Sequence, residues 1–428
     1  MKLLVFGHRL EVGGTQVNSV ELAATLRDRH GYEIVYFAAP GPMVKFVEQK
    51  GLTFMPAPDA HEHPSLPRIR ALNTLVRRER PDLIHAWDWW QCLDAYYGAH
   101  LLMRIPLLVS VMTMELHRIL PKAVPTTLGT PELLDEARSR GRSRLDLLLP
   151  PVDVNYNAPG AVDPQPFRDR YNIWDNEITL VTVSRVVESL KSESLVRTIE
   201  AIRTLGHEFP VRLIIVGDGN ARQRIEILAN EVNKELGRNA VLLIGALLDP
   251  REAYAAADIV IGMGGSALRA MAFEKPVIVV GEKGFSGAFT PSTAHWFYYH
   301  GIYGLGDGNT APDRLINDIH GLLRERNNFA GLGRFSRDFV VKHFSLEQVA
   351  ERFADFCKTA VAQIAPLDVA TTDGLRTATL WTYAKVLPRS LRRRIKILGN
   401  RKVEKATATR PAMRPDHSGV LTLDKDLT

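Results

Sequence analysis

The sequence predicts an α/β protein with two doubly wound domains, each a parallel sheet with helices on both faces. Three observations carry this prediction. Short apolar runs that suit buried strands alternate with helical periodicity through residues 1–111 and again through 178–280. Residues 150–166 are rich in Pro and Asn, which is the composition of a linker between two domains. Residues 258–281 follow the order strand, glycine turn, helix and strand, the βαβ unit of a parallel sheet.

The first domain is expected to contain five strands with helices between them. The strands are expected at 3–6, 32–37, 53–55, from 81 to 85, and 105–111. Helices are expected over 17–26, where apolar residues recur at helical spacing, and over 72–78. Ligands of doubly wound sheets bind beyond the carboxyl ends of the strands, so functional residues are expected in the turns that follow them.

The second domain shows the same alternation. Strands are expected at 178–184, 211–216, 241–244, 259–261 and 277–280, and helices at 194–205, 221–236, 250–257 and 266–273. Residues 290–296 are expected to form a long polar loop, which either shapes specificity or simply lies at the surface. Residues 346–361 have the apolar spacing of an amphipathic helix.

Composition favours a globular protein of the cytosol. The 428 residues are 45% hydrophobic and 24% charged, enough for two full cores. Two cysteines, Cys92 and Cys357, argue against a disulfide scaffold. The opening apolar run is too short for a signal peptide, and no run approaches the ~18 residues of a spanning helix. We expect a cytoplasmic protein, at most peripheral at the inner face of a membrane.

The basic character of the chain is concentrated in its tail. Residues 366–428 contain 13 Lys and Arg against 6 Asp and Glu, a net charge of +7, whereas the whole chain carries +6. A basic nucleic-acid-binding core is therefore not expected. Within the tail, an apolar-aromatic stripe that includes Leu380, Trp381 and Tyr383 precedes a basic cluster at 389–396. This pattern suits an anionic membrane surface, a helix docked on the body of the protein, or a solvated run of charge. Residues 401–428 have little apolar content and are expected to be disordered.

The glycine turn at 262–265 is the strongest local signal of a binding site. Gly264 and Gly265 follow a predicted strand and open a helix, with Ser266 as the expected N-cap. Backbone N–H groups and the positive helix end then face outward, which suits an anion such as a phosphate.

The order of residues here resembles the donor-binding segment of glycosyltransferase family four, retaining glycosyltransferases of the GT-B fold. The matching positions are Gly262, Gly264, Leu268, Ala270, Met271, Ala272, Lys275, Pro276 and Val277. The two glutamates of the family pattern fall on Ile261 and Arg269, so this chain is a divergent member that lacks both carboxylates.

The resemblance covers roughly residues 1–363 and implies two Rossmann-like domains facing across a cleft. It implies an acceptor domain at 1–160, a nucleotide-sugar donor domain at 161–345 and a C-terminal crossover helix at 346–365. The basic tail at 366–428 lies outside it.

Several donor-binding residues follow from the same resemblance. Gly13 and Gly14, in the turn after the first strand, fall where the family contacts donor phosphates, although an ordinary turn would look the same. Arg185 and Lys191, after the strand at 178–184, fall where the family clamps the diphosphate. Preorganised cations there would stabilise the charge that develops on a leaving nucleoside diphosphate.

Four further positions complete the expected donor site. Gly217 and Gly219 end a strand and either lie near the nucleotide or form a plain turn. Arg269 would pair with a donor carboxylate or phosphate. Glu282 follows the strand at 277–280 and would serve as a substitute carboxylate for sugar or ribose hydroxyls, unless it is simply an exposed loop residue.

The first domain is expected to hold the acceptor. Residues 85–90 resemble a family segment in which Asp88 would accept hydrogen bonds from hydroxyls, while the tryptophans stack on sugars or belong to the core. The family's histidine in this domain falls near Met112, and His117 or Glu115 would replace it, unless His117 has only a structural role. His117 and Asp88 are the predicted catalytic residues.

The resemblance implies retaining transfer of a sugar from a nucleoside diphosphate sugar to a hydroxyl acceptor, with neither cofactor nor metal. The sequence has no metal-ligand spacing. Two other readings stay open: a non-catalytic GT-B scaffold that acts as a partner or binding subunit, and a sugar-nucleotide epimerase of similar fold.

Overall fold

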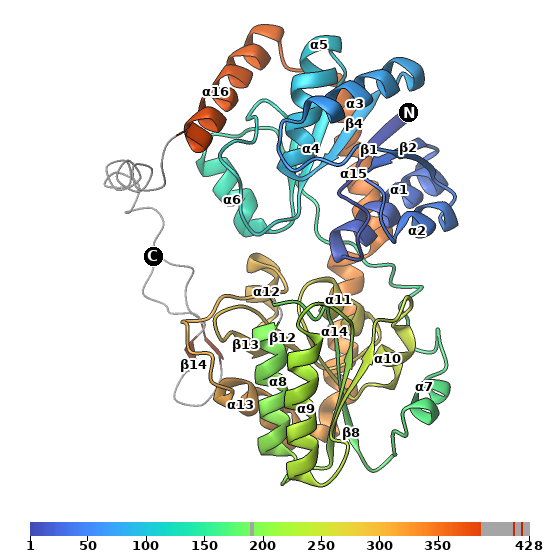
Figure 1. Cartoon of the computed structure of the whole chain (residues 1–428), viewed down its shortest axis with the longest axis vertical. Coiled ribbons are helices and arrows are strands. Elements are labelled where there is room, and N and C mark those ends of the chain that lie inside the picture. The colour runs from blue at the N-terminus through green and yellow to red at the C-terminus, as the bar shows by residue number, and fades with distance from the viewer. Residues whose placement is uncertain (189–191, 387–413, 416–420, 423–428) are drawn as a thin grey trace. The chain divides into compact units, whose positions relative to one another are not determined.

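The computed structural model describes residues 1–188, 192–386, 414–415 and 421–422 (Figure 1). Contacts divide the chain into two compact units. Unit 1 consists of Met1–Pro151 and Leu346–Arg410, and unit 2 of Val152–Ser345 and Pro411–Thr428. The break at Pro151 lies within the Pro-rich segment that composition indicated as a linker.

Unit 1 is built on a seven-stranded sheet of order β3-β2-β1-β4-β5-β6-β7, with every pair parallel. Its strands are β1 (Lys2–Phe6), β2 (Glu33–Ala38), β3 (Thr53–Pro56), β4 (Leu83–Trp87), β5 (Leu107–Val111), β6 (Thr126–Leu128) and β7 (Leu145–Leu147). Because β1 pairs with both β2 and β4, the strand order reverses between β1 and β4, and ligands of such sheets bind beside this switch point.

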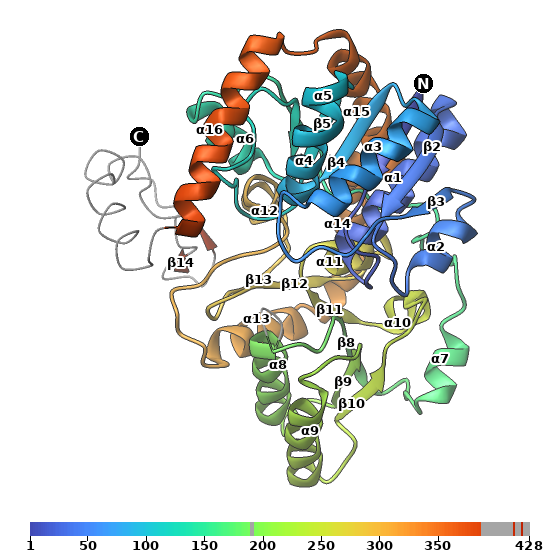
Figure 2. The same cartoon turned by 45° about the horizontal axis from the view of Figure 1, so that its top comes forward.

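Helices cover both faces of this sheet (Figure 2). They are α1 (Gly14–His30), α2 (Val44–Gln49), α3 (Leu66–Glu79), α4 (Asp88–Ala95), the π-helical turn η1 (Tyr96–His100), α5 (Leu101–Met103), α6 (Pro131–Ser139), α15 (Leu346–Ala362) and α16 (Leu367–Val386). Side chains alternate across β1: Leu3 and Val5 join a core with α1 and α15, and Leu4 and Phe6 join a second core with α3 and α4. A strand buried on both faces needs an almost wholly apolar sequence, which explains why these strands were visible from composition.

Unit 2 has a six-stranded sheet of order β10-β9-β8-β11-β12-β13, parallel except for the edge strand β13. The strands are β8 (Ile178–Val183), β9 (Val211–Val216), β10 (Val241–Gly245), β11 (Ile259–Gly262), β12 (Val277–Val280) and β13 (Ser286–Ala288). The helices are α7 (Gln165–Arg170), α8 (Ser192–Leu205), α9 (Arg222–Leu236), α10 (Arg251–Ala256), α11 (Gly265–Ala272), α12 (Ala294–His300), α13 (Asp313–Arg324), the 3-10 turn η2 (Arg326–Asn328) and α14 (Phe329–Phe344). A short antiparallel pair, β14 (Arg414–Pro415) and β15 (Leu421–Thr422), completes the described elements. The switch point lies between β8 and β11.

Two local expectations are wrong. Residues 290–296 do not form one long loop, because α12 begins at Ala294 and Trp296 is only 8% exposed, stacked on Phe285 at 5.4 Å between ring centroids. The apolar ring gains more from burial than from a surface position. Ser266 is not the N-cap of α11, since the helix begins at Gly265 and the N-cap is Gly264 with φ of 56°. A glycine adopts that left-handed backbone readily.

The helix α16 is docked on unit 1, where it contacts α5 (Figure 2). The hydroxyls of Tyr96 and Tyr97 donate to the carbonyls of Ala370 and Gly374 at 2.6 and 2.8 Å. The indole N–H of Trp381 donates to the carbonyl of His63. Part of the stripe that suggested a membrane surface therefore contacts protein, and the basic cluster at 389–396 lies outside the described residues.

Candidate functional site

The loop that carries Arg185 is held in place by a glycine turn from the neighbouring strand. Ser184 N–H donates to Val216 O at 3.0 Å, and Val186 N–H donates to Asp218 O at 2.9 Å. A Cβ on Gly217, whose φ is 152°, would come within 1.8 Å of Ser184 O. A Cβ on Gly219 would lie 2.3 Å from the carbonyl of Val186. These glycines are thus required by the packing of two strand ends, whatever else they contact.

Arg185 is exposed at the carboxyl end of β8. Lys191, its predicted partner in holding a diphosphate, lies outside the described residues. The intervening Glu188 forms a two-point ion pair with Arg224, at 3.2 and 2.9 Å. Arg185 therefore remains the described cation of this predicted clamp.

The start of α11 lies on the other side of the switch point. Its first turn has no side-chain cap and no acidic residue, so no side chain of that turn neutralises the positive end of the helix. The Arg269 guanidinium reaches back along the helix and donates to Gly265 O at 3.3 Å. Ser266 accepts a hydrogen bond from the Tyr254 hydroxyl at 3.2 Å. A guanidinium beside the positive end of a helix is unfavourable by itself and becomes favourable when an anion binds between them.

Glu282 is half-buried in the loop after β12, and its carboxylate accepts a hydrogen bond from the Tyr303 hydroxyl. The loop itself is fixed by Glu193, whose carboxylate accepts hydrogen bonds from Lys283 N and Gly284 N, both at 2.8 Å. Glu193 also pairs with Arg197 at 3.0 Å. Glu282 is therefore held at the same sheet edge as Arg185 and α11, and it is not a free surface side chain.

In unit 1, Gly13 and Gly14 are the N-cap and first residue of α1. This helix also begins without a side-chain cap or an acidic residue in its first turn. A Cβ on Gly14 would meet no atom within 4 Å, and one on Gly13 would meet the flexible end of Gln16. The fold of unit 1 does not require either glycine sterically, so the space beside Gly14 is open to a ligand.

Asp88 lies directly after β4 and is 4% exposed. Its Oδ2 lies 3.0 Å from Nε2 of His8, in the loop after β1, and Thr113 donates to its Oδ1 at 3.3 Å. Its φ of 67° is unusual for a residue other than glycine. Three strand ends of unit 1 thus converge on one carboxylate. His8 was not predicted from the sequence; its place two residues beyond a buried strand was the available signal.

His117 has a different environment. Its ring stacks on Trp89 at 4.3 Å between centroids and an interplanar angle of 15°. Burial lowers the pKa of His117, opposed by the charge of Glu115. Trp87 is fully buried in the core, whereas Trp90 is 44% exposed. The aromatic segment therefore divides between core and surface, and His117 belongs with its half-buried part.

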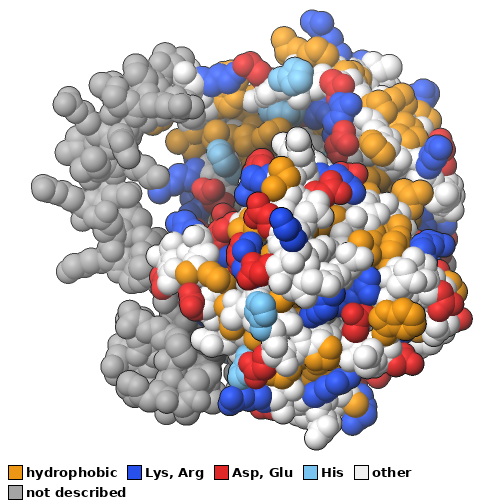
Figure 3. All heavy atoms as spheres, turned by 60° about the horizontal axis from the view of Figure 1, so that its bottom comes forward, with side chains coloured by type: hydrophobic (Ala, Val, Ile, Leu, Met, Phe, Trp, Pro, Cys, Tyr) orange, Lys and Arg blue, Asp and Glu red, His pale blue; other side chains and the backbone are white. Residues whose placement is uncertain are grey.

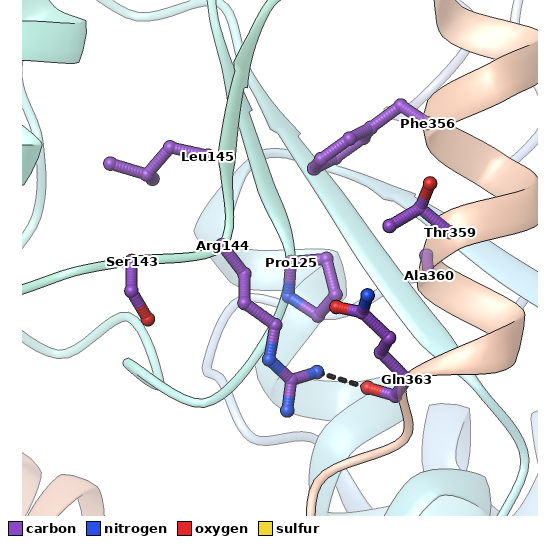
Figure 4. A pocket seen from close by; sticks show the side chains of 8 residues that line it. All are labelled: Pro125, Ser143, Arg144, Leu145, Phe356, Thr359, Ala360 and Gln363. Atoms are coloured by element: carbon purple, nitrogen blue, oxygen red, sulfur yellow. Dashed lines mark hydrogen bonds between the residues drawn. The ribbon is translucent and has the colours of Figure 1, made fainter.

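The pocket drawn in Figure 4 lies at the amino-terminal ends of β6 and β7 in the unit 1 sheet, away from the carboxyl ends that carry the predicted site. Its volume is about 190 Å³. Pro125 and Arg144 directly precede β6 and β7, Phe356 comes from α15, and Gln363 directly follows that helix. Arg144 donates to the carbonyl of Gln363, and burial lowers its pKa. A cation that satisfies a carbonyl at the end of a helix is a structural arrangement, so this pocket is not part of the predicted site.

Within the described parts of the chain, no three His, Cys, Asp or Glu side chains are grouped as a metal would need. None of the helices in these parts of the chain has the length and apolar character that a membrane span requires. Basic and acidic side chains are interspersed over the face shown in Figure 3.

Two family profiles match the chain. The profile described as "Glycosyltransferase Family 4" matches residues 12–139, and the one described as "Glycosyl transferases group 1" matches residues 177–297. The first falls in unit 1 and the second in unit 2.

A curated relative is the GDP-mannose-dependent alpha-(1-6)-phosphatidylinositol monomannoside mannosyltransferase of Mycobacterium tuberculosis (strain ATCC 25618 / H37Rv). It is 26% identical over 228 residues, which cover 50% of this chain and 56% of the relative. The match thus spans little more than half the length of that protein.

Solved structures share the architecture. A glycosyltransferase from Rickettsia africae ESF-5 aligns with a TM-score of 0.68 and 15% identity, over 84% of this chain and 98% of that one. Anabaena Alr3699/HepE in complex with UDP aligns with a TM-score of 0.66 and 17% identity, over 84% and 100%. With the two parallel sheets, these similarities confirm the predicted GT-B fold.

Proposed function

This chain belongs to the glycosyltransferases related to family four, and on that premise we propose that it transfers a sugar from a nucleoside diphosphate sugar to a hydroxyl acceptor. We propose further that the anomeric configuration is retained and that no metal or cofactor takes part. Unit 2 would bind the donor, and unit 1 would bind the acceptor.

The arrangement of charge at the unit 2 switch point carries this proposal. Arg185 follows one central strand, and the uncapped start of α11 with Arg269 follows the other. These groups supply a guanidinium on each side and a row of N–H groups, which is what a diphosphate needs. As the bond to the sugar breaks, the diphosphate gains charge, and preorganised cations stabilise that charge more than the ground state.

Because the two family glutamates are missing, other residues must contact the sugar of the donor. Ile261 is 1% exposed within β11 and faces the apolar core of unit 2, so it offers no polar contact. We propose that Glu282, fixed by Tyr303, provides the carboxylate for sugar or ribose hydroxyls. Arg269 would contact an acidic group of the donor, either its phosphate or a carboxylate on its sugar.

A non-catalytic scaffold is the second candidate. The replacement of both donor-site carboxylates by Ile261 and Arg269, and of the family histidine by Met112, favours it. A scaffold of this kind would keep only part of the donor site, too little to bind a sugar nucleotide, and would act as a partner or binding subunit.

A thermal-shift screen of the purified full chain separates the two. The panel contains UDP, GDP, UDP-glucose, UDP-glucuronic acid and GDP-mannose, because relatives of this chain bind UDP or use GDP-mannose. A shift with one sugar nucleotide that exceeds the shift with its bare diphosphate supports a donor site and identifies the donor. No shift with any compound supports the scaffold.

The stereochemistry is tested next with the donor so identified. Lipid-linked and free glycosides are offered as acceptors, and the anomeric proton coupling of the product is measured by NMR. The same configuration as in the donor supports retention, and the opposite configuration overturns it.

We also propose that the protein is cytoplasmic and that its tail contacts an anionic membrane. Arg389, Arg392, Arg393, Arg394 and Lys396 form the basic cluster that would do so, at about 1 kcal/mol for each residue near the surface. Since α16 is docked on unit 1, the test keeps it and compares chains of residues 1–386 and 1–428. A larger fraction of the longer chain should sediment together with phosphatidylserine vesicles. Equal binding contradicts the proposal.

A further inference from the structure

A histidine and an almost fully buried aspartate form a hydrogen-bonded pair at the switch point of unit 1. His8 Nε2 and Asp88 Oδ2 are 3.0 Å apart, and the two side chains are 28% and 5% exposed. The chain separates them by 80 residues, and only the pairing of β1 with β4 places the two strand ends side by side. Neither residue belongs to the charged arrangement of unit 2.

The partner of His8 determines which ring nitrogen is free. A carboxylate accepts hydrogen bonds and donates none, so Nε2 carries the proton that Asp88 accepts. In the neutral ring, Nδ1 then has a lone pair available to accept a proton. This is the arrangement in which a carboxylate orients a histidine as a base.

The structure fixes Asp88 at a cost to its backbone. A φ of 67° is uncommon outside glycine, and the surrounding fold must hold the residue there. Its second oxygen accepts from Thr113 at 3.3 Å. The carboxylate is thus held from two sides, and its orientation is set before any ligand arrives.

The loop that carries His8 is also fixed. Gly7 N–H donates to Phe37 O at 3.0 Å, and Leu10 N–H donates to Ala39 O at 3.0 Å. A Cβ on Gly7 would lie 2.6 Å from the Tyr36 hydroxyl, so close packing sets the path of the chain just before His8. His8 itself stays partly open to solvent.

The charged groups beside this pair are engaged with each other. Arg9 pairs with Glu11 at 3.0 Å and also with Asp59. These three side chains are each about half-exposed. Asp88 is therefore the charged group that the structure places in contact with the His8 ring.

We propose that His8 is the base that takes the proton of the acceptor hydroxyl, with Asp88 as its positioning residue. The inference rests on the proposed transfer function and names a residue for the acceptor side of that reaction. As the acceptor oxygen forms its bond to the anomeric carbon, the bond from that carbon to the donor phosphate breaks. The electron pair of the broken bond leaves with the diphosphate. The hydroxyl proton moves to His8 Nδ1, Asp88 stabilises the resulting imidazolium, and solvent later removes the proton.

The test uses three variants of the full chain. His8→Gln removes the imidazole. Asp88→Asn presents an amide N–H to Nε2 and so favours the tautomer with hydrogen on Nδ1, and asparagine tolerates the left-handed backbone at this position. His8→Ala leaves space for added imidazole. The controls are His30→Gln and Asp135→Asn in the same unit, away from this pair.

Turnover with the donor from the screen should fall at least ~100-fold in His8→Gln and Asp88→Asn, the usual range for a lost base. The thermal shift produced by that donor should persist, and imidazole should restore part of the activity of His8→Ala. A structural role alone would produce no rescue. Turnover within ~3-fold of wild type in both variants, with an active wild type, overturns the proposal.

A second measurement separates failure of this proposal from failure of the proposed function. Nitrogen-15 NMR of the histidine ring in the wild-type protein should show hydrogen on Nε2 of His8 and none on Nδ1, with the reverse in Asp88→Asn. The opposite tautomer in the wild type overturns the role of Asp88. A wild type that shows this tautomer but transfers no sugar refutes the proposed function, and the base role with it.

Discussion

The two units share a doubly wound architecture, yet their switch points carry opposite chemistry. In unit 1 a buried carboxylate, Asp88, meets a histidine and a threonine. In unit 2 the equivalent edge presents Arg185, Arg269 and the uncapped start of α11. Topology therefore places both sites at strand ends, and the side chains decide what each can bind.

Glycine also differs between the two units. Gly217 and Gly219 of unit 2 lie where a Cβ would overlap backbone atoms, whereas Gly14 of unit 1 faces open space. A glycine in a turn after a strand is thus a packing requirement in one unit and room for a ligand in the other. The sequence pattern alone does not distinguish these cases.

We expect the largest effect from removing the two predicted diphosphate-binding cations of unit 2. Arg185→Ala with Lys191→Ala should weaken nucleotide binding at least ~100-fold, because each lost charge-assisted hydrogen bond is worth about 1.5–3 kcal/mol. Isothermal titration with the diphosphate measures it. Lys234→Ala with Arg326→Ala, an equal loss of charge at exposed positions of the same unit, is the control. Unchanged affinity in the first double variant removes these two residues from the site.

The next effect concerns stability, and it distinguishes a glycine required by packing from a glycine that faces open space. Gly217→Ala should destabilise unit 2 by ~3 kcal/mol, because the methyl group meets Ser184 O and the backbone φ of 152° disfavours a side chain. Gly14→Ala should leave stability unchanged or raise it by ~0.5–1 kcal/mol, because it removes a glycine from a helix. Urea unfolding measures both. Similar losses in the two variants would contradict the distinction.

The last effect appears only when pH is changed, as a pair of opposite pH dependences. In unit 1, complete burial lowers the pKa of His85 from 6.5 to about 3. The unfolded chain binds this proton more readily, so stability is present above pH 6.5 and is lost as pH falls, by ~3 kcal/mol between pH 6.5 and 4. In unit 2, burial raises the pKa of Asp318 from 3.8 to about 6. A hydrogen bond with Ser286 and the positive charges of two arginines oppose this rise. Here the protonated carboxyl stabilises unit 2 below pH 3.8, and this contribution of ~3 kcal/mol is lost as pH rises through 6.

Two variants test this pair. His85→Gln should flatten the acid loss of unit 1, and Asp318→Asn should raise the stability of unit 2 at pH 7. The free energy of unfolding of each variant and of wild type is measured by urea unfolding from pH 4 to 7.5. The slope of this free energy against pH is then compared between variant and wild type. A parallel pH profile in either variant rules out that residue as the cause.

Much of the fold was accessible from the sequence because its strands are buried on both faces. The predominantly apolar sequences of β1, β4, β8, β9 and β12 left little ambiguity. The three-residue strands β6, β7 and β13 were not anticipated, since so short a run has no detectable period. The sequence does not predict the helix α12, because the polar turn residues 290–293 directly precede it and favour a loop.

The candidate sites also have a part that the sequence predicts and a part that only the tertiary structure shows. The positions of Arg185, Asp88 and the start of α11 follow from motifs that are local in the sequence, because a strand, its turn and the next helix are continuous in the chain. Tertiary structure alone joined His8 to Asp88, docked α16 on unit 1 and placed the backbone of Ser184 against Gly217. Each of these contacts joins segments that are tens to hundreds of residues apart, and no local pattern encodes which strand ends will be neighbours in the sheet. The sequence therefore determined the architecture and the sign of charge at each strand end, and strand order decided which side chains meet, because pairing in a parallel sheet is set by packing over the whole unit.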